Sequence, residues 1–181
     1  MRITSPAFQD QAAMPPAHTC LGENISPPLQ FGSIPARARS LVLIVEDRDA
    51  PRPWVHWLVF DIPPSTTSVP AGKIPADGTE GRSNGGTQGY EGPCPQCFSG
   101  THRYHFQLFA LDIMLGLPED SDRARVRAAM QDHVIDYAAL VGLQEGTKAA
   151  ETKVAAGVAH AQIAGADAIG AESMEAKTAD T

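Results

Sequence analysis

Three short runs of apolar residues form the clearest pattern in the chain. They cover residues 40–47, 55–62 and 102–111, and each is rich in Val, Ile, Leu or Phe. Continuous apolar runs of this length are typical of strands buried within a sheet. The proline-rich connection between the first two runs is too short for a helical crossover, so these two strands should be antiparallel.

One helix is predicted after the third strand. It should run from about residue 122 to about residue 136, and Asp120 and Ser121 can cap its start. The apolar positions that recur on one face of this helix are Val126, Met130 and Val134. The residues at positions 137–142 favour a final strand over a continuation of this helix. Residues 1–35 and 63–100 are mostly turn and loop, because glycine and proline punctuate them.

The composition changes after residue 146. Residues 147–181 are rich in alanine with interspersed glycines. Alanine favours helix, whereas each glycine costs about 1 kcal/mol relative to alanine, so both a helix and a disordered extension stay open. We therefore predict a folded domain over residues 1–146 and an extension over residues 147–181. One hypothesis for the whole chain is a structural module whose extension mediates assembly.

Composition and charge narrow the class of protein. The 181 residues are 43% hydrophobic and 19% charged, which is typical of a globular chain with a sizeable core. The formal net charge of −7 argues against nucleic acid as a partner and against broad binding to anionic membranes. No apolar run approaches the length of about 18 residues that a membrane-spanning helix needs. The first residues contain no apolar signal region, so we expect a cytoplasmic location.

Polar side chains end the apolar faces of all three predicted strands. Alternate residues share a face, which puts Asp47 at the end of the first strand and His56 at the start of the second. His102 and Tyr104 begin one face of the third strand. If that strand starts at the same edge of the sheet, these four residues converge on one pocket, and Asp49 could join them.

The same counting sets the neighbours of His56 on the second strand. Leu58 and Phe60 should share its face, and Trp57 should pack on the back of the sheet. Trp54 could stack on a ligand or form a hydrophobic lip.

The residue types at this pocket suit a small anion. Two histidines can donate N–H hydrogen bonds to a phosphate or a carboxylate, and Tyr104 adds a hydroxyl. Asp47 can orient a histidine or accept a ligand ammonium. Gly100 lets the backbone come close to a ligand and offers its own N–H. No catalytic residue, metal or cofactor is assigned.

Five segments in order resemble the signature motifs of the phosphatidylethanolamine-binding protein family. Two of them resemble its bacterial Raf-kinase-inhibitor-like branch. The segments are Asn24-Ile25-Ser26-Pro27-Pro28-Leu29, Asp47-Arg48-Asp49-Ala50-Pro51, Val55-His56-Trp57, Gly89-Tyr90-Glu91-Gly92-Pro93-Cys94-Pro95 and Gly100-Thr101-His102-Arg103-Tyr104. The similarity runs from about residue 1 to residue 145 and covers none of the extension.

The resemblance implies a mainly β fold, an antiparallel β-sandwich with Greek-key connections and a helix near the C-terminus. It also implies an anion pocket at one edge of the large sheet. The implied pocket residues are Asp47, Asp49, His56, Gly100, His102 and Tyr104. The implied ligands are phosphate and phosphorylated head groups, with a kinase or a protease as a protein partner to inhibit. Arg48 replaces the usual proline, which places a cation beside the pocket. The Ala50–Pro51 bond is open to either isomer.

Other readings of the same residues stay open. A small-molecule hydrolase could use the His/Asp pocket, although no nucleophile is obvious. Residues 81–85 match G-x-S-x-G, but loop residues follow where a nucleophile elbow needs a helix. A metal site using both histidines and the aspartates is disfavoured, because the chain has no local metal-binding spacing such as H-x-H.

Three cysteines, Cys20, Cys94 and Cys97, are too few for a disulfide scaffold. We expect reduced structural cysteines in a cytoplasmic protein. The alternatives are a thiol that lines the pocket, a pairing of Cys20 with Cys94 or Cys97, and a local bridge within the C-x-x-C.

Overall fold

The three apolar runs form adjacent strands of a six-stranded sheet in the computed structural model, which describes residues 1–148. They are β4 (Ser40–Asp47), β5 (Trp54–Ile62) and β8 (Ser99–Leu111). β4 lies between the other two and is antiparallel to both, which confirms the predicted orientation of the first pair. The strand order of the sheet is β2-β9-β8-β4-β5-β7.

Shorter elements complete the described part of the chain. They are β1 (Arg2–Thr4), β2 (Ala12–Ala13), η1 (Pro16–His18), β3 (Leu29–Gly32), β6 (Ser68–Val69), β7 (Thr79–Glu80), η2 (Pro95–Cys97), α1 (Arg123–Met130) and β9 (Val134–Thr147). β1, β3 and β6 form a second, three-stranded sheet. The predicted mainly β sandwich with a helix near the C-terminus is confirmed.

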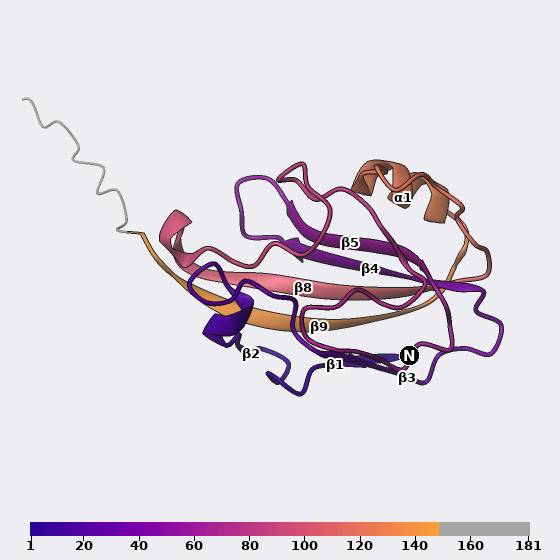
Figure 1. Ribbon diagram of the computed structural model, residues 1–181, viewed down its shortest axis with the longest axis horizontal. Helices are drawn as coiled ribbons and strands as arrows, with labels where there is room; N and C mark the ends of the chain where they lie inside the picture. The colour runs from indigo at the N-terminus through magenta and orange to yellow at the C-terminus, as the bar shows by residue number, and fades with distance from the viewer. Residues whose placement is uncertain (149–181) are drawn as a thin grey trace, which may run out of the picture. The chain divides into compact units, whose positions relative to one another are not determined.

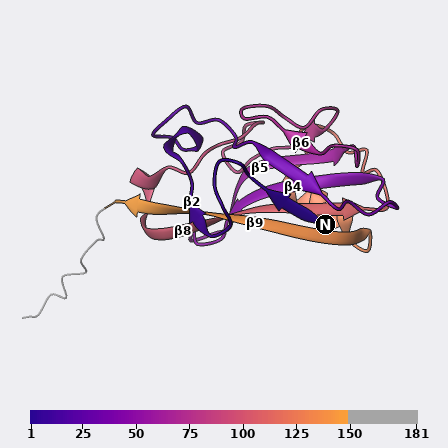
Figure 2. The same ribbon diagram turned by 90° about the horizontal axis from the view of Figure 1, so that it is seen from below.

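The large sheet is covered on both faces. The small sheet lies against one face and α1 against the other (Figure 1). Seen from below, the strands of the small sheet lie over the large one (Figure 2). Alternate residues of β4 point to opposite faces, so Leu43 packs between the sheets and Ile44 packs towards α1. Burial on both faces explains why the strand reads as a continuous apolar run.

The helix is shorter than predicted. α1 begins after Asp122, whose side chain accepts a hydrogen bond from the backbone amide of Arg125 over 2.8 Å. The cap is therefore Asp122, and the predicted capping by Asp120 and Ser121 is wrong. The helix ends at Met130, and Asp132 takes a left-handed backbone conformation with φ of 65°. This turn sends the chain into β9 instead of continuing the helix to residue 136.

β9 pairs antiparallel with β8 from Leu111↔Val134 to Ser99↔Thr147. The predicted final strand over 137–142 is confirmed and extends in both directions. Val134, which was expected on the helix face, begins the strand. Pairing with β9 satisfies the backbone groups along one side of β8, which a longer helix would leave unpaired. β9 ends at Thr147, and residues 149–181 of the predicted extension lie outside the described residues.

Within residues 1–148, no helix has the length and apolar character needed to cross a membrane.

Candidate functional site

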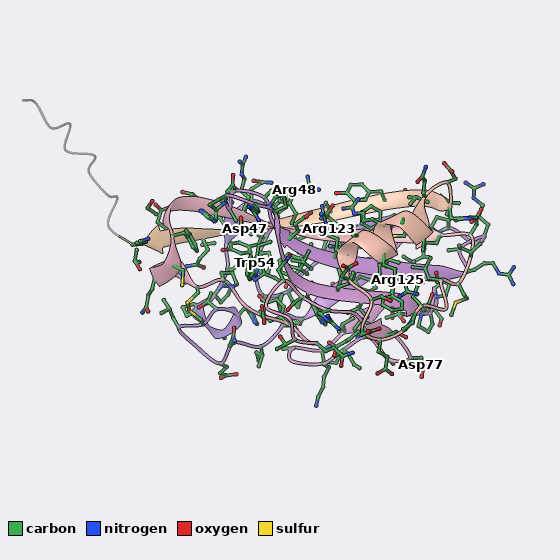
Figure 3. The ribbon with its side chains drawn as sticks, turned by 90° about the horizontal axis from the view of Figure 1, so that it is seen from above. Asp47, Arg48, Trp54, Asp77, Arg123 and Arg125 are labelled. Carbon is green, nitrogen blue, oxygen red and sulfur yellow. A yellow bond between two sulfur atoms is a disulfide. The ribbon has the colours of Figure 1, made fainter. Side chains whose placement is uncertain are left out.

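A cavity of about 430 Å³ lies where β4 ends and where β5 and β8 begin. Its walls consist of Asp47, Ala50, Pro51, Trp54, His56, Glu91, Gly92, Cys94, Cys97, Phe98, His102 and Tyr104. The four residues that strand counting brought together, Asp47, His56, His102 and Tyr104, are all in this set. Asp47 pairs with Trp54 across the two strands, at the same end of the sheet (Figure 3).

His102 is held in one orientation. Its Nδ1 donates a hydrogen bond to Oδ2 of Asp47 over 2.7 Å. The ring of Phe98 stacks on the imidazole, with centroids 3.8 Å apart. The other carboxylate oxygen of Asp47 accepts hydrogen bonds from the backbone amides of Asp49 and Ala50. These two hydrogen bonds anchor the loop after β4. Because Nδ1 is engaged, Nε2 is the nitrogen that His102 offers to a ligand.

A β-bulge positions His56. Val45 lies opposite Trp57 and Glu46 lies opposite Val55, so His56 is an extra residue on β5. A bulge lets a side chain leave the strict alternation of its strand. The strand therefore presents His56 to the cavity beside Tyr104, with ring centroids 5.1 Å apart.

Because of the bulge, the residues after His56 on β5 lie on other faces of the sheet than strand counting predicted. Leu58 and Phe60 pack in the cluster beneath α1 rather than on the cavity side. Trp57 is not on the back of the sheet. It packs in the core between the two sheets, where its Nε1 donates to Glu80 over 2.9 Å. His56 does line the cavity, where strand counting placed it, although the assumption of unbroken alternation was wrong.

Burial favours the neutral form of the His56 imidazole by lowering its pKa. Its side chain is 8% exposed. Removal from water lowers the pKa of His56, and the Glu91 carbonyl and the Asp47 charge offset part of that effect. Nδ1 donates to the backbone oxygen of Glu91 over 2.6 Å, because a carbonyl can only accept. His56 therefore also turns Nε2 towards any ligand.

Tyr104 supplies a protonated phenol. It lies opposite Asp47 in the register of β4 and β8, and it is almost fully buried. Burial raises the pKa of Tyr104 well above its usual value, and the negative charge of Asp47 raises it further. The hydroxyl consequently keeps its proton and remains a hydrogen-bond donor.

Two predicted pocket residues lie outside the cavity wall. Asp49 binds Arg103 instead, accepting from its backbone amide at 2.8 Å and from Nε at 3.0 Å. The hydrogen bond from the Arg103 side chain lowers the pKa of Asp49 to about 2. Gly100 is exposed at the start of β8 with φ of 76°, a conformation that favours glycine. The backbone thus explains the glycine without a ligand contact.

Arg48 also differs from its expected place. It was expected beside the pocket, but its side chain lies on the opposite face of the sheet, where it donates to Gln107 over 2.7 Å. The loop that follows it adopts a trans Ala50–Pro51 bond.

Sequence reasoning missed several parts of the wall. Phe98, which stacks on His102, is the most consequential, together with the backbone of Glu91 that holds His56. Both lie in or near loop residues 89–98, and the family motif at 89–95 was the available signal. Trp54, considered as a stacking or lip residue, lines the cavity and is 42% exposed.

The expectation of reduced cysteines is wrong for two of the three. Cys20 and Cys94 form a disulfide across 74 residues of sequence. The backbone brings them together, because the amide of Cys20 donates to the carbonyl of Pro93 and the two Cα atoms are 5.0 Å apart. Cys97 is free and exposed, and it lines the cavity, as the pocket-lining alternative had it.

Within residues 1–148, no group of three or more His, Cys, Asp or Glu side chains could hold a metal ion.

Ser83 of the G-x-S-x-G segment is buried in a loop, and its hydroxyl lies 3.5 Å from that of Thr87. It lies in the wall of another pocket, beside Arg123. The strand-turn-helix setting of a nucleophile elbow is therefore missing at this segment.

The fold and the cavity define a β-sandwich with a ligand-sized pocket at the end of its large sheet. The family model described as phosphatidylethanolamine-binding protein matches residues 4–145. A UPF0098 protein of Methanothermobacter thermautotrophicus is 46% identical over 149 residues, covering 79% of this chain and 97% of its own. LppC of Mycobacterium tuberculosis, a proposed lipoprotein, is 41% identical over 147 residues, covering 81% of this chain and 73% of its own.

Solved structures agree with this match. A proposed phosphatidylethanolamine-binding protein homolog, CT736 from Chlamydia trachomatis, superposes with a TM-score of 0.75 at 37% identity and covers 80% of this chain and 96% of its own. YbcL of Escherichia coli, titled a new member of the mammalian family, gives 0.74 at 28% identity with coverage of 80% and 97%. The chain belongs to the phosphatidylethanolamine-binding protein family.

Proposed function

We propose that the protein binds a small anion or a phosphoester in the cavity at the end of the large sheet, without catalysing a reaction on it. One observation carries the proposal. His56 and His102 line the same cavity, and each uses its Nδ1 to bind the protein, so each offers Nε2 to a ligand. The Tyr104 phenol adds a donor beside them.

The hydrogen bonds at Nδ1 determine how protons accompany the ligand. In a neutral imidazole whose Nδ1 carries the proton, Nε2 is an acceptor. A phosphate oxygen needs a donor, so binding requires an added proton on an imidazole or on the phosphate itself. A phosphomonoester has its second pKa near 6, close to that of histidine. The bound state therefore shares a proton between the ring and the phosphate, and binding takes up a proton near neutral pH.

The other walls favour an organic phosphate over a bare ion. Trp54, Phe98 and Pro51 give the cavity an apolar side next to the imidazoles. Both oxygens of Asp47 already accept hydrogen bonds from the protein, so its main role is to orient His102 rather than to bind a ligand ammonium. A phosphoethanolamine-type head group would set its phosphate on the imidazoles and its alkyl part on the aromatic wall.

Calorimetric titration with phosphate and with phosphoethanolamine tests the proposal. Wild type should bind at pH 6, and the His56→Ala/His102→Ala variant should lose the binding step that takes up a proton in the cavity. His133→Gln is a matched control, because His133 also bonds an aspartate, Asp112 at 2.9 Å, but lies outside the cavity. Phosphoethanolamine should be recovered intact by phosphorus NMR. Release of inorganic phosphate that disappears in the double variant would instead favour the hydrolase.

Inhibition of a kinase or a protease belongs to the same proposal, and its support is the family alone. The cytoplasmic location stays a prediction. The Cys20–Cys94 disulfide favours an oxidising compartment instead, and the name of the relative LppC agrees with that. Cell fractionation with an antibody against this chain distinguishes the two locations.

A further inference from the structure

Three arginines converge on the face of the large sheet that lies away from the cavity. Arg48 comes from the loop after β4, and Arg123 and Arg127 come from α1. Together with Glu46 they line a groove of about 520 Å³. Arg48 and Arg123 lie close together in Figure 3, whereas Arg125 lies farther along α1.

Buried polar groups of the sheet hold these arginines in place. Glu46, which is 1% exposed, pairs with Arg123 at 2.6 Å and with Arg48 at 3.6 Å. Gln107 donates to Glu46 over 3.1 Å, and its carbonyl oxygen accepts from Arg48 at 2.7 Å and from Arg127 at 3.2 Å. The guanidinium is thus preorganised at each of the three positions, which lowers the entropy cost of binding a ligand there.

Charge at the groove is not balanced. Glu46 is the one carboxylate in the described wall, against three guanidinium groups. Burial and the nearby positive charge of Arg123 lower the pKa of Arg127, and Arg48 adds to the repulsion. Nε of Arg123 and Nε of Arg127 are buried and have no hydrogen-bond partner among residues 1–148. The groove therefore carries an excess of positive charge that the described residues of its wall do not balance.

We propose that this groove is a second anion site, which binds a phosphomonoester or a comparable dianion independently of the cavity. A dianion would neutralise the two excess positive charges and would remove the repulsion between the arginines. Guanidinium groups bind phosphate oxygens with two parallel hydrogen bonds, which suits their planar donors. The volume falls in the range of small-molecule sites, so the groove has room for a ligand larger than a bare phosphate.

A purely structural role accounts for less of this arrangement. One arginine would compensate Glu46, and a buried ion pair is by itself weak evidence of a stabilising role. The second and third arginines add mutual repulsion without adding a carboxylate partner. A ligand supplies the missing negative charge.

Titration with phenyl phosphate, followed by heteronuclear NMR, separates the two sites. The backbone amides of Ala124 and Arg127 report on the groove, and those of Gly92 and His102 report on the cavity. The groove amides should shift and saturate with their own dissociation constant, also in the His56→Ala/His102→Ala variant. If the cavity does not bind phenyl phosphate, the groove amides should still shift. A failure of the proposed function can therefore be distinguished from a failure of the groove proposal.

Three substitutions test the arginines. Arg123→Gln/Arg127→Gln should weaken groove binding by about tenfold or more, since each charge-assisted hydrogen bond contributes on that scale. Arg48→Gln gives a second variant on a loop, with no helix packing to lose. Arg125→Gln is the matched control, because Arg125 is exposed on the same helix and outside the groove. The proposal is overturned if the groove amides do not shift, or if their shifts persist unchanged in both test variants.

Discussion

Asp47 and His102, which are 55 residues apart in the sequence, share a buried hydrogen bond of 2.7 Å at the inner wall of the cavity. Asp47 ends β4 and His102 lies near the start of β8, and the antiparallel register of these strands brings the two ends together. The bond determines which imidazole nitrogen meets a ligand.

Asp47→Asn should weaken phosphate binding by roughly tenfold, because a hydrogen bond to a charged group contributes on that scale. The amide is nearly the size of the carboxylate but loses the charge that holds Nδ1–H of His102. Calorimetry at pH 6 measures the change. Asp112→Asn breaks the exposed pair with His133 and should leave affinity unchanged. Equal affinity in wild type and Asp47→Asn would mean that the bond does not orient the ring for binding.

Affinity for phosphate should fall as the pH rises from about 5.5 to about 8, a range around the reference pKa of histidine. Burial lowers the pKa of His56 in the free protein, and a bound anion raises it. Binding therefore takes up a proton, and the affinity is highest below the free-state pKa and is lost as pH passes the bound-state pKa. Calorimetry in buffers of different ionisation enthalpy counts the protons. A flat pH profile with no proton uptake would contradict the assignment of Nε2 as an acceptor in the free protein.

Cys20→Ser should lower the free energy of unfolding by about 2–5 kcal/mol, the usual range for loss of a native disulfide. The bond links the segment after η1 to the residue before η2 across 74 residues, so its loss frees a long stretch of the unfolded chain. Thermal and denaturant unfolding measure the loss. Cys97→Ser is the control and should leave stability unchanged, because Cys97 is free and exposed. Thiol titration of the folded wild type should find one reactive cysteine, and three would show that the bond is absent.

Asp49→Asn should leave affinity for phosphoethanolamine unchanged, because the carboxylate binds Arg103 and lies outside the cavity wall. It should also remove a small, acid-sensitive part of the stability. The pKa of Asp49 is depressed to about 2, so this contribution is present above its unfolded pKa near 3.8 and is lost as pH falls through about 2. Titrations at pH 6 together with acid unfolding curves provide the readout. A large loss of affinity would place Asp49 in the ligand site after all, as the family resemblance implies.

Local pattern was sufficient for much of the fold. β4, β5 and β8 are buried on both faces. A strand of this kind has apolar residues at consecutive positions, so it can be recognised from the sequence alone. Strand parity and a short connection predicted that Asp47 and His56 lie at one end of the sheet. His102 and Tyr104 joined them only on the assumption that the third strand starts at the same edge, which the register of β4 and β8 confirms. The family motifs pointed to the same residues, and to a fold that the two sheets confirm.

Contacts between distant segments decided the rest. Residues 131–136 have a helical pattern, but pairing with β8 draws Val134 and the residues after it into β9. The bulge at His56 depends on how β5 registers against β4, which no single strand encodes. The Cys20–Cys94 bond forms because the fold brings together the two loops that carry these cysteines. Arg48 lies on the opposite face of the sheet because its side chain contacts Gln107 and Glu46 there. The sequence by itself determined which segments are strands and which polar groups end them. Only the tertiary structure decided register, bulge and pairing, because those depend on neighbours far away along the chain.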